Sequence, residues 1–335
     1  MIPLTLNSSQ NEIMPNLQDV IKERLDDLDI VPNEYLGQHF LVDEIVLSQI
    51  ANMATGSNVI EVGAGVGQLT EKLAETADSV VSIEIDRRFE PILERIQLGH
   101  TNLEVIYGNA LKELPIIMKD LEKQRDLELQ LIANLPYHIT EPFMQMMARY
   151  KVDMVLLVGE RFARAALNNN TDSLLYTKNS FLINTFYEVR SLAEVPRKSF
   201  YPEPRTKSRV IELIYKDAKQ LSVFDYLARS LFLTAKKSPL VKNVLKNALT
   251  KYENIGGGLL SKKEANRKTR RSNRQRLAGI YRRNVGVVTE TGFTQNMARG
   301  RINRIGIPKS ILEKPFSQLN NDEIRMLSSK LQLMN

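Results

Sequence analysis

The sequence contains no cysteine and only three histidines. The absence of cysteine excludes disulfides, thiolate metal sites and a cysteine nucleophile. His39, His100 and His138 lack the spacing of metal ligands, so no metal cofactor is expected. Whatever chemistry the chain performs must therefore come from other side chains, from the backbone or from an organic cofactor.

Long apolar runs are also missing. The longest ones, such as 154–158, are far shorter than the roughly 20 residues of a membrane span. The first residues show no basic segment followed by an apolar one, so secretion is not expected and we predict a cytoplasmic protein. The 335 residues, with 43% hydrophobic and 25% charged side chains, are typical of a soluble protein with two domains.

The net charge of +7 is distributed unevenly along the chain. Residues 1–219 carry 23 Lys and Arg against 32 Asp and Glu, whereas residues 220–335 carry 23 against 7. Ten basic residues and one acidic residue lie between Lys262 and Arg283. A solvated basic face is the simpler explanation of such a run, but the excess extends over a whole predicted domain. We therefore expect a polyanion-binding part, with a nucleic acid as the partner.

Short apolar runs alternate with segments of helical pattern from Asn58 onward. This alternation predicts a parallel, doubly wound α/β sheet. The predicted strands are Val59–Val62, Val80–Ile85, Leu103–Ile106, Leu129–Ala133 and Met154–Val158. Two later runs, Phe181–Val189 and Arg209–Tyr215, are predicted to close the sheet with an antiparallel edge.

The domain limits follow from these patterns. Residues 1–30 are polar and acidic, with one amphipathic stretch, and are interpreted as an N-terminal extension that forms a peripheral helix or a loose tail. Residues 31–216 are predicted to form the sheet domain. Residues 217–335 are predicted to form a small, basic, helical domain, with helices at 223–235, 240–252 and 322–333.

The first predicted strand runs into a glycine-rich turn, Glu61-Val62-Gly63-Ala64-Gly65-Val66-Gly67. Glycines there let the backbone approach a ligand closely and start a helix that faces it. Glu84 ends the second strand, 21 residues beyond Gly63, where a carboxylate accepts hydrogen bonds from ribose hydroxyls. This pattern favours a nucleoside cofactor. By itself it leaves open a tight turn without a ligand, or an NAD enzyme.

The fourth strand ends in Asn134-Leu135-Pro136-Tyr137. An amide oxygen and a neighbouring carbonyl that accept the N–H bonds of an adenine N6 amine would localise its lone pair and aim it at a methyl donor. Proline fixes the backbone for this task, and tyrosine offers a face for the extruded base. A strand-end turn without function is the alternative for the tetrapeptide in isolation.

With these motifs in place, the chain resembles the ribosomal RNA adenine N6-dimethyltransferase family, most closely its KsgA type. The resemblance covers roughly residues 34–250 and resumes near 307–333. It rests on the segments Gly37–Asp43, Glu61–Gly65, Ile83–Asp86, Asn134–Tyr137 and Val195–Ser208. It implies a class I, Rossmann-like methyltransferase sheet with a small helical C-terminal domain, and S-adenosylmethionine as the cofactor.

The resemblance also assigns roles to residues of this sequence. Cofactor-contact positions fall at His39, Leu41, Gly63, Gly65, Glu84, Asn109 and Asn134. Catalytic positions fall at Asn134, Pro136, Tyr137 and Phe200, where the two aromatic rings lie beside the target base. His39 stands where the family usually has Asn, and Asn109 stands where an Asp is expected. An amide oxygen still accepts the hydrogen bond expected there, but without the charge.

The expected function is dimethylation of adenines in small-subunit rRNA during ribosome biogenesis, by a monomer whose partner is rRNA or a pre-ribosomal subunit. Two alternatives remain at this point. One is the Erm type, which modifies large-subunit rRNA and confers macrolide resistance. The other is a non-enzymatic nucleic-acid-binding relative. Intact Asn134, Pro136 and Tyr137 speak against lost chemistry.

Overall fold

The computed structural model describes residues 16–121, 128–136, 138–217, 221–255 and 293–334. The chain forms two compact units. Unit 1 comprises residues 1–136 and 195–207, and unit 2 comprises residues 137–194 and 208–335. Because each unit combines segments that are distant in sequence, neither corresponds to one continuous stretch of the chain.

Unit 1 contains four strands in the order β4-β3-β2-β5. They are β2 (Asn58–Val62), β3 (Ser79–Glu84), β4 (Leu103–Tyr107) and β5 (Leu129–Asn134). β2 pairs in parallel with both β3 and β5, and β3 pairs in parallel with β4. The sequence predicted all four strands to within one residue at each end. Four consecutive residues of β2 and three of β5 are buried, so both faces of these two strands are covered.

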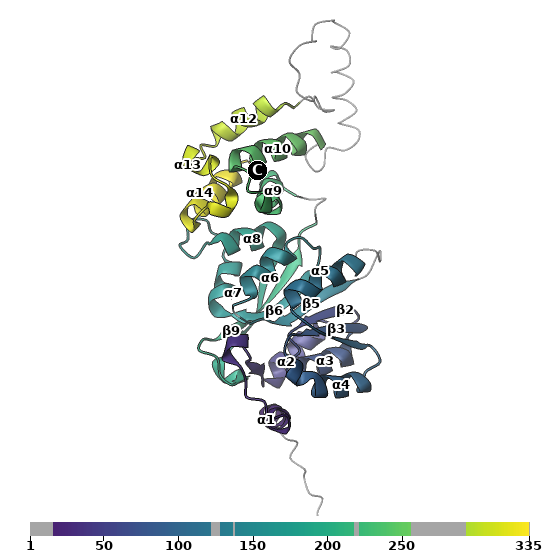
Figure 1. The fold of residues 1–335 in the computed structure, drawn as a ribbon. Helices are drawn as coiled ribbons and strands as arrows, with labels where there is room; N and C mark the ends of the chain where they lie inside the picture. The colour runs from purple at the N-terminus through teal and green to yellow at the C-terminus, as the bar shows by residue number, and fades with distance from the viewer. Residues whose placement is uncertain (1–15, 122–127, 137, 218–220, 256–292, 335) are drawn as a thin grey trace, which may run out of the picture. The chain divides into compact units, whose positions relative to one another are not determined.

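Helices cover both faces of these strands. α2 (Glu44–Asn52) precedes the sheet, and the crossovers contain α3 (Gln68–Thr76), α4 (Glu90–Gly99) and α5 (Ala110–Leu121). The order β2-β3-β4 advances in one direction, and the chain then returns to β5 on the other side of β2. Right-handed crossovers therefore place α3 and α4 on one face and α5 on the other, as Figure 1 shows.

Two peripheral elements complete unit 1. α1 (Leu17–Asp27) begins at Asn16, whose side chain accepts the N–H of Asp19, and it buries Ile21 and Leu25. The amphipathic stretch predicted there is thus a packed helix. A two-stranded ladder joins β1 (Phe40–Leu41) to β8 (Phe200–Tyr201), antiparallel, which brings the segment 195–207 to the start of the sheet domain.

Unit 2 begins with α6 (Thr140–Met147), β6 (Asp153–Gly159) and α7 (Glu160–Leu167). Its strands follow the order β6-β9-β7, with β7 at Tyr187–Val195 and β9 at Ser208–Tyr215. β6 pairs with β9 in antiparallel fashion, with Leu156 opposite Ile211. The predictions of β6 and of an antiparallel strand at 209–215 are therefore confirmed.

The strand predicted at 181–189 is wrong over most of its length. Residues Lys178–Phe186 form the helix α8, and only the residues from Tyr187 on are extended. The helix begins with a capping box, in which the side chains of Thr177 and Ser180 bond each other's backbone N–H. Its residues are buried nearly all round, so the run shows no helical period and resembles a buried strand.

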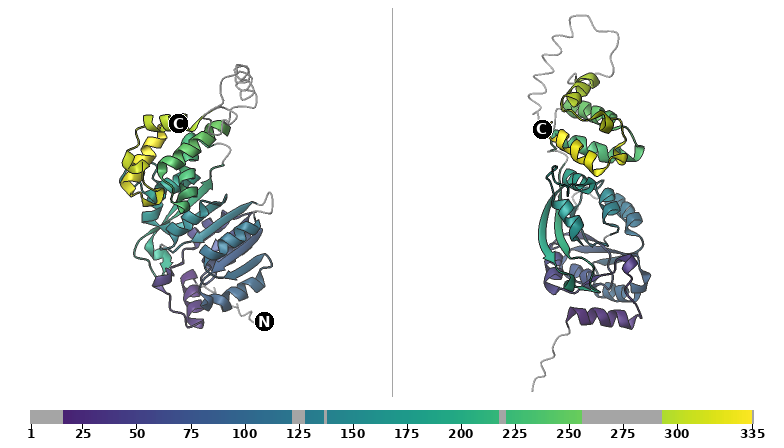
Figure 2. Two further views of the ribbon diagram at one scale, coloured as in Figure 1. Left: turned by 45° about the horizontal axis from the view of Figure 1, so that its top comes forward. Right: turned by 90° about the vertical axis from the view of Figure 1, so that its left-hand side faces the viewer.

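The remaining helices form a helical region with a core of its own. They are α9 (Val223–Thr234), α10 (Val241–Ile255), α12 (Gln295–Arg304), α13 (Lys309–Leu312) and α14 (Asn321–Gln332). Figure 2 shows α10 and α12 side by side. The core packs Leu231, Leu245, Ile302 and Phe316 against the α8 residue Phe181. The predicted helices at 223–235, 240–252 and 322–333 are confirmed.

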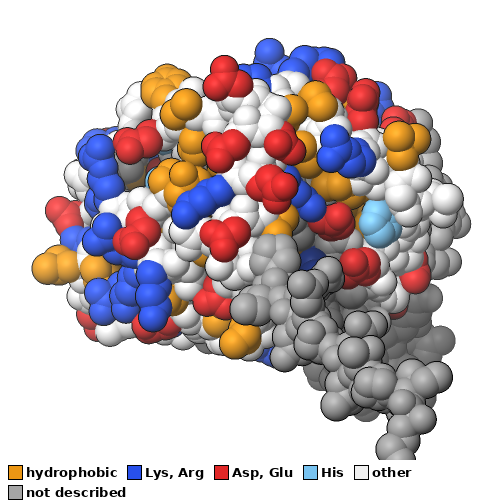
Figure 3. Space-filling view, turned by 90° about the horizontal axis from the view of Figure 1, so that it is seen from below, with side chains coloured by type: hydrophobic (Ala, Val, Ile, Leu, Met, Phe, Trp, Pro, Cys, Tyr) orange, Lys and Arg blue, Asp and Glu red, His pale blue; other side chains and the backbone are white. Residues whose placement is uncertain are grey.

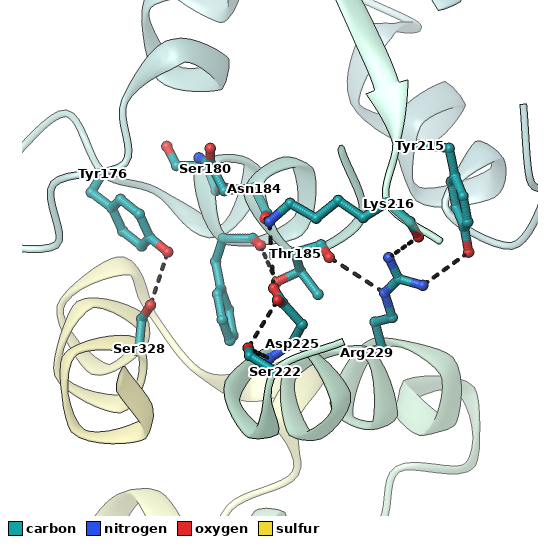
Figure 4. A network of polar contacts seen from close by, with 11 residues as sticks. Tyr176, Ser180, Asn184, Thr185, Tyr215, Lys216, Ser222, Asp225, Arg229 and Ser328 are labelled. Carbon is teal, nitrogen blue, oxygen red and sulfur yellow. Dashed lines mark hydrogen bonds and ion pairs between the residues drawn. The ribbon is translucent and has the colours of Figure 1, made fainter. Parts of the chain in front are cut away.

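A polar network joins this helical region to α8 and β9 within unit 2 (Figure 4). Arg229 is 6% exposed, and its guanidinium donates to the carbonyls of Lys216, at 2.6 Å, and Thr185, at 3.4 Å. The same group lies over the rings of Phe186 and Tyr215. On the other side, Tyr176 Oη and Ser328 Oγ are hydrogen-bonded at 2.9 Å. The buried guanidinium of Arg229 thus supplies hydrogen bonds to two backbone carbonyls that would otherwise lack this donor.

Candidate active site

The glycine turn between β2 and α3 depends on backbone that only glycine adopts readily. Gly63, Gly65 and Gly67 have φ angles of +88°, +56° and +84°. A Cβ on Gly65 would lie 3.0 Å from Phe40 Cε1, and one on Gly67 would lie 2.2 Å from Ile96 Cδ1. The turn is therefore held against its neighbours with no room for side chains at these two positions.

The carboxylate of Glu84, at the end of β3, is directed at this turn. Its Oε2 accepts the N–H of Gly65 at 2.7 Å, and its Oε1 accepts the N–H of Asp86 at 2.7 Å. Glu84 is 5% exposed, and burial raises its pKa, while the two backbone hydrogen bonds oppose that rise. The predicted pairing of the turn with an acid on the second strand is thus a direct contact.

Asp86 caps the short helical turn that follows β3, as its position in the sequence suggests. Its side chain accepts the N–H of Arg88 and is also hydrogen-bonded by the side chains of Arg88 and Gln38. Burial alone would raise the pKa of Asp86, but these hydrogen bonds hold it below its usual range. Gln38 therefore links the segment before β1 to the end of β3.

Glu61, on β2, was not singled out as a site residue by the sequence analysis. The hydroxyls of Thr70 and Ser82 both donate to its Oε2, at 2.7 and 2.6 Å. Its Oε1 is buried and has no hydrogen-bond partner among the residues that the structure describes. Burial raises the pKa of Glu61 to about 7. An acid directly before the glycines was the signal that could have identified it.

The end of β5 packs against the segment before β1. Asn134 Nδ2 donates to the carbonyl oxygen of His39 at 3.2 Å, and no donor to its Oδ1 is found among the residues that the structure describes. Gly37 has φ of +69°, and a Cβ there would lie 2.8 Å from Pro136 Cβ. These two contacts fix the orientation of Asn134 and the position of Pro136.

His39 is in turn held by the segment 195–207. Its Nδ1 lies 2.8 Å from the carbonyl oxygen of Pro202. A carbonyl oxygen only accepts, so Nδ1 carries a proton in this contact. Leu41 lies opposite Phe200 in the β1–β8 ladder, and both side chains are buried. The structure thus brings together predicted positions from three segments that are far apart in the sequence: His39 and Leu41, Asn134 and Pro136, and Phe200.

Two predicted residues remain less defined. Asn109 follows β4, where its side-chain oxygen accepts the N–H of Leu111 at 2.9 Å and caps the start of α5. The neighbouring Gly108 N–H donates to the carbonyl of Glu84, which places this loop beside the end of β3. Tyr137, the predicted stacking residue, lies outside the described residues.

Arg24 of α1 is a further residue that the sequence analysis missed. Its guanidinium donates to the carbonyl oxygen of Val66 at 2.9 Å and pairs with Glu71 of α3 at 2.8 Å. Val66 belongs to the glycine turn, so α1 holds this turn from outside the sheet. Lys22, two residues before Arg24 on α1, has its ammonium 5.2 Å from the centre of the Tyr201 ring. No motif in residues 16–30 indicated these contacts.

The comparison with family models agrees with this geometry. Residues 32–273 match the model of the ribosomal RNA adenine dimethylase family. This chain belongs to that family. Members of the family use S-adenosylmethionine as the methyl donor. The match covers every predicted site residue, from His39 to Phe200.

Individual relatives give the same result. The chain is 31% identical over 238 residues to the ribosomal RNA small subunit methyltransferase A of Latilactobacillus sakei. The aligned stretch covers 68% of this chain and 79% of that protein. It is 33% identical over 184 residues to the protein of that name from Listeria monocytogenes, which covers 53% of this chain and 62% of that protein. The matched stretch thus spans less than two thirds of the Listeria protein.

A solved structure is also similar. The crystal structure of a dimethyladenosine transferase from Plasmodium falciparum is 26% identical, with a TM-score of 0.50, over 88% of this chain and 96% of that one. The predicted fold class, a Rossmann-like methyltransferase sheet with a helical C-terminal region, is confirmed.

The residues of unit 1 fit the cofactor of the family. At Gly63 a Cβ would meet only the backbone oxygen of Asn134, at 3.7 Å, so this glycine leaves space beside the turn. Glu84 presents a carboxylate at the turn, and Glu61 Oε1 is a buried acceptor without a described partner. Among the described residues, no group of three or more acidic or histidine side chains could hold a metal ion. None of the described helices is long and apolar enough to cross a membrane.

Proposed function

We propose that this protein is an S-adenosylmethionine-dependent rRNA adenine N6-dimethyltransferase that acts on small-subunit, 16S-type rRNA during ribosome biogenesis. The observation that carries the proposal is the position of Asn134. Its side-chain amide is fixed by the His39 carbonyl. The backbone carbonyl oxygen of Asn134 lies 3.7 Å from the position that a Cβ of Gly63 would occupy. The end of β5 and the glycine turn are therefore adjacent.

The cofactor would be held by the residues around this turn. Glu84 would accept the ribose hydroxyls, and Gly63 and Gly65 would let the backbone approach the ligand. His39, Leu41 and Asn109 complete the proposed contacts. When bound, S-adenosylmethionine supplies an electrophilic methyl group on a sulfonium centre.

The amine of the target adenine would be oriented by Asn134 and Pro136. The Asn134 Oδ1 and a backbone carbonyl at Pro136 accept the two N–H bonds, which localises the nitrogen lone pair. Because Asn134 and Pro136 are held by His39 and Gly37, little reorganisation is needed when the base enters. Tyr137 and Phe200 are proposed to flank the base, and proximity and orientation then suffice for the transfer.

RNA binding is assigned to the C-terminal part, in line with the proposed limits of a methyltransferase domain at 31–216 and an RNA-binding domain at 217–335. On the face drawn in Figure 3, the coloured acidic and basic side chains are intermixed. Residues 220–335, in contrast, have an excess of 16 positive charges. The basic segment Lys262–Arg283 lies outside the described residues. We also propose that the protein is cytoplasmic and acts as a monomer.

The relatives favour small-subunit rRNA over the Erm-type alternative, since both bacterial proteins are named ribosomal RNA small subunit methyltransferase A.

The decisive experiment maps dimethylated adenines. Small-subunit and large-subunit rRNA from a strain that lacks the gene are incubated separately with the purified protein and S-adenosylmethionine, and the nucleosides of each are analysed by mass spectrometry. We expect dimethyladenosine in the small-subunit rRNA. Dimethyladenosine in 23S rRNA alone would support the Erm type, and none in either would support a binding protein.

A further inference from the structure

The helical region of unit 2 contains a pocket of about 310 Å³ between α10, α12 and α13. Each helix contributes residues at helical spacing to it. They are Lys242, Asn243 and Lys246 of α10, Arg299, Ile302 and Asn303 of α12, Lys309 and Leu312 of α13, and Glu313 directly after α13. Because residues three and four apart share a helix face, three helix faces converge on one cavity.

The charge of the pocket is strongly one-sided. Four of its nine residues are Lys or Arg, and Glu313 is its single carboxylate. Lys242 is paired with Glu313 at 3.5 Å, with both side chains largely exposed. Lys246, Arg299 and Lys309 form no ion pair with any carboxylate in the described part of the chain. Arg301, two residues beyond Arg299 and therefore on another face of α12, is in contrast paired with Glu253, outside the pocket.

The lining also contains groups that a bare phosphate does not need. The apolar residues of the lining are Ile302, which is buried, and Leu312, which is half-buried. Asn243 and Asn303 are exposed and carry amides with both donors and acceptors. The volume is at the small end of the roughly 300–1,000 Å³ that is usual for ligand pockets. Apolar surface, amides and cations together match a base, its polar edge and its flanking phosphates.

We propose that this pocket binds one unstacked nucleotide of an RNA strand, distinct from the adenine that is methylated. Sequence-specific RNA recognition relies on bases in loops and bulges that are free to leave the stack. The base packs on Ile302 and Leu312, the amides of Asn243 and Asn303 bond its edge, and Lys246, Arg299 and Lys309 neutralise the adjoining phosphates. The inference rests on the proposed function in that it takes RNA as the partner.

The experiment compares the full-length protein with variants of this pocket. Affinity for a fluorescently labelled, single-stranded RNA oligonucleotide is measured by anisotropy over a range of salt concentrations. The double variant K246A/R299A removes two unpaired cations from the lining. The matched control is Lys251→Ala, which removes a lysine from the exposed side of α10 that does not line the pocket. Thermal unfolding followed by circular dichroism verifies that each variant is folded.

We expect K246A/R299A to weaken RNA binding about tenfold and to reduce the slope of log affinity against log salt by up to about 1.4, since each phosphate contact of single-stranded RNA contributes about 0.7. Asn303→Ala should weaken binding without changing the slope, because it removes an uncharged contact. Equal affinities and slopes for K246A/R299A and Lys251→Ala would overturn the proposal.

A second titration, with AMP, distinguishes an RNA strand from a free nucleotide. We expect AMP to bind no more tightly than millimolar, because it lacks the neighbouring contacts of a strand. Micromolar AMP binding that K246A/R299A abolishes, together with unchanged RNA affinity, would assign the pocket to a free nucleotide and overturn the proposal. Neither assay measures methyl transfer, so a failure of the proposed enzymatic function would be seen separately.

Discussion

In unit 1 the candidate site is built largely from backbone. The Gly65 N–H, the carbonyls of His39 and Val66 and the glycine φ angles determine its shape. In the helical region of unit 2 the pocket is lined by nine side chains from three helices, most of them exposed. A backbone-built site excludes even a methyl group at several positions, whereas an exposed side-chain pocket loses affinity in steps as charges are removed. Variants in unit 1 should therefore act on chemistry or cofactor binding, and variants in the helical region on RNA affinity or stability.

The largest effect is expected at Asn134. Asn134→Ala removes the oriented acceptor of the amine, so the rate of methyl transfer should fall by about 10²–10³-fold, as for loss of a preorganised polar group. RNA affinity should stay within about twofold, since the charged contacts that supply most of it are elsewhere. Single-turnover methylation and anisotropy measure the two effects. A folded variant with a normal rate would show that Asn134 does not orient the amine.

A large effect on stability is expected at Arg229 in unit 2. Arg229→Ala leaves the carbonyls of Lys216 and Thr185 without their donor, so the free energy of unfolding should fall by about 3 kcal/mol. Arg164→Ala removes an exposed guanidinium that pairs with Glu160, a carboxylate that keeps its ion pair with Arg209, and should cost less than about 0.5 kcal/mol. Denaturant unfolding gives both values. Equal losses in the two variants would mean that the buried network contributes nothing beyond a surface charge.

Glu61 should make the stability of unit 1 depend on pH. Its pKa is raised from 4.5 to about 7, so the folded state holds the proton more tightly than the unfolded state. The stabilisation is fully present below pH 4.5 and is lost as the pH rises through about 7, with a total on the order of 3 kcal/mol. Glu61→Gln should remove this dependence. Unfolding free energies at pH 5 and pH 8 test it, and parallel curves for variant and wild type would contradict the assignment.

Glu84 should act on cofactor affinity. Glu84→Ala removes the carboxylate at the glycine turn and should weaken S-adenosylmethionine binding by about 1.5–3 kcal/mol, the range of hydrogen bonds to charged groups. Calorimetric titration of the cofactor measures this loss. Glu104→Ala, at an exposed position on β4, is the matched control that keeps wild-type affinity. Unchanged binding by a folded Glu84→Ala protein would remove Glu84 from the site.

The smallest effect is expected at Arg24, which acts through the turn. Arg24→Ala should raise KM for S-adenosylmethionine about three- to tenfold, the equivalent of about 1 kcal/mol for one hydrogen bond to the Val66 carbonyl, with little change in kcat. Glu71→Gln removes the ion pair but keeps the carbonyl contact, so its effect should be smaller. If Glu71→Gln matched Arg24→Ala, the ion pair rather than the turn contact would be responsible.

The sequence by itself determined strands β2 to β6 and β9, the positions of the glycine turn and Glu84, and the helices at 223–235, 240–252 and 322–333. These signals are local, because apolar runs, turn glycines and helical spacing act over a few residues. The same local signal failed at Phe181–Val189, where burial all round a helix removed its period and the capping box at Thr177 decided the structure. The roles of Phe200 and Tyr137, and the domain limits, stay predictions.

Only the tertiary structure decided which distant segments hold the site. The contacts of Arg24 with Val66, of Gly37 with Pro136 and of His39 with Pro202 join residues that lie 42 to 163 positions apart. The pocket of the helical region likewise depends on the packing of α10 against α12 and α13. Such contacts follow from how whole elements pack, and no short stretch of sequence carries that information, because the same helix face can pack against many partners.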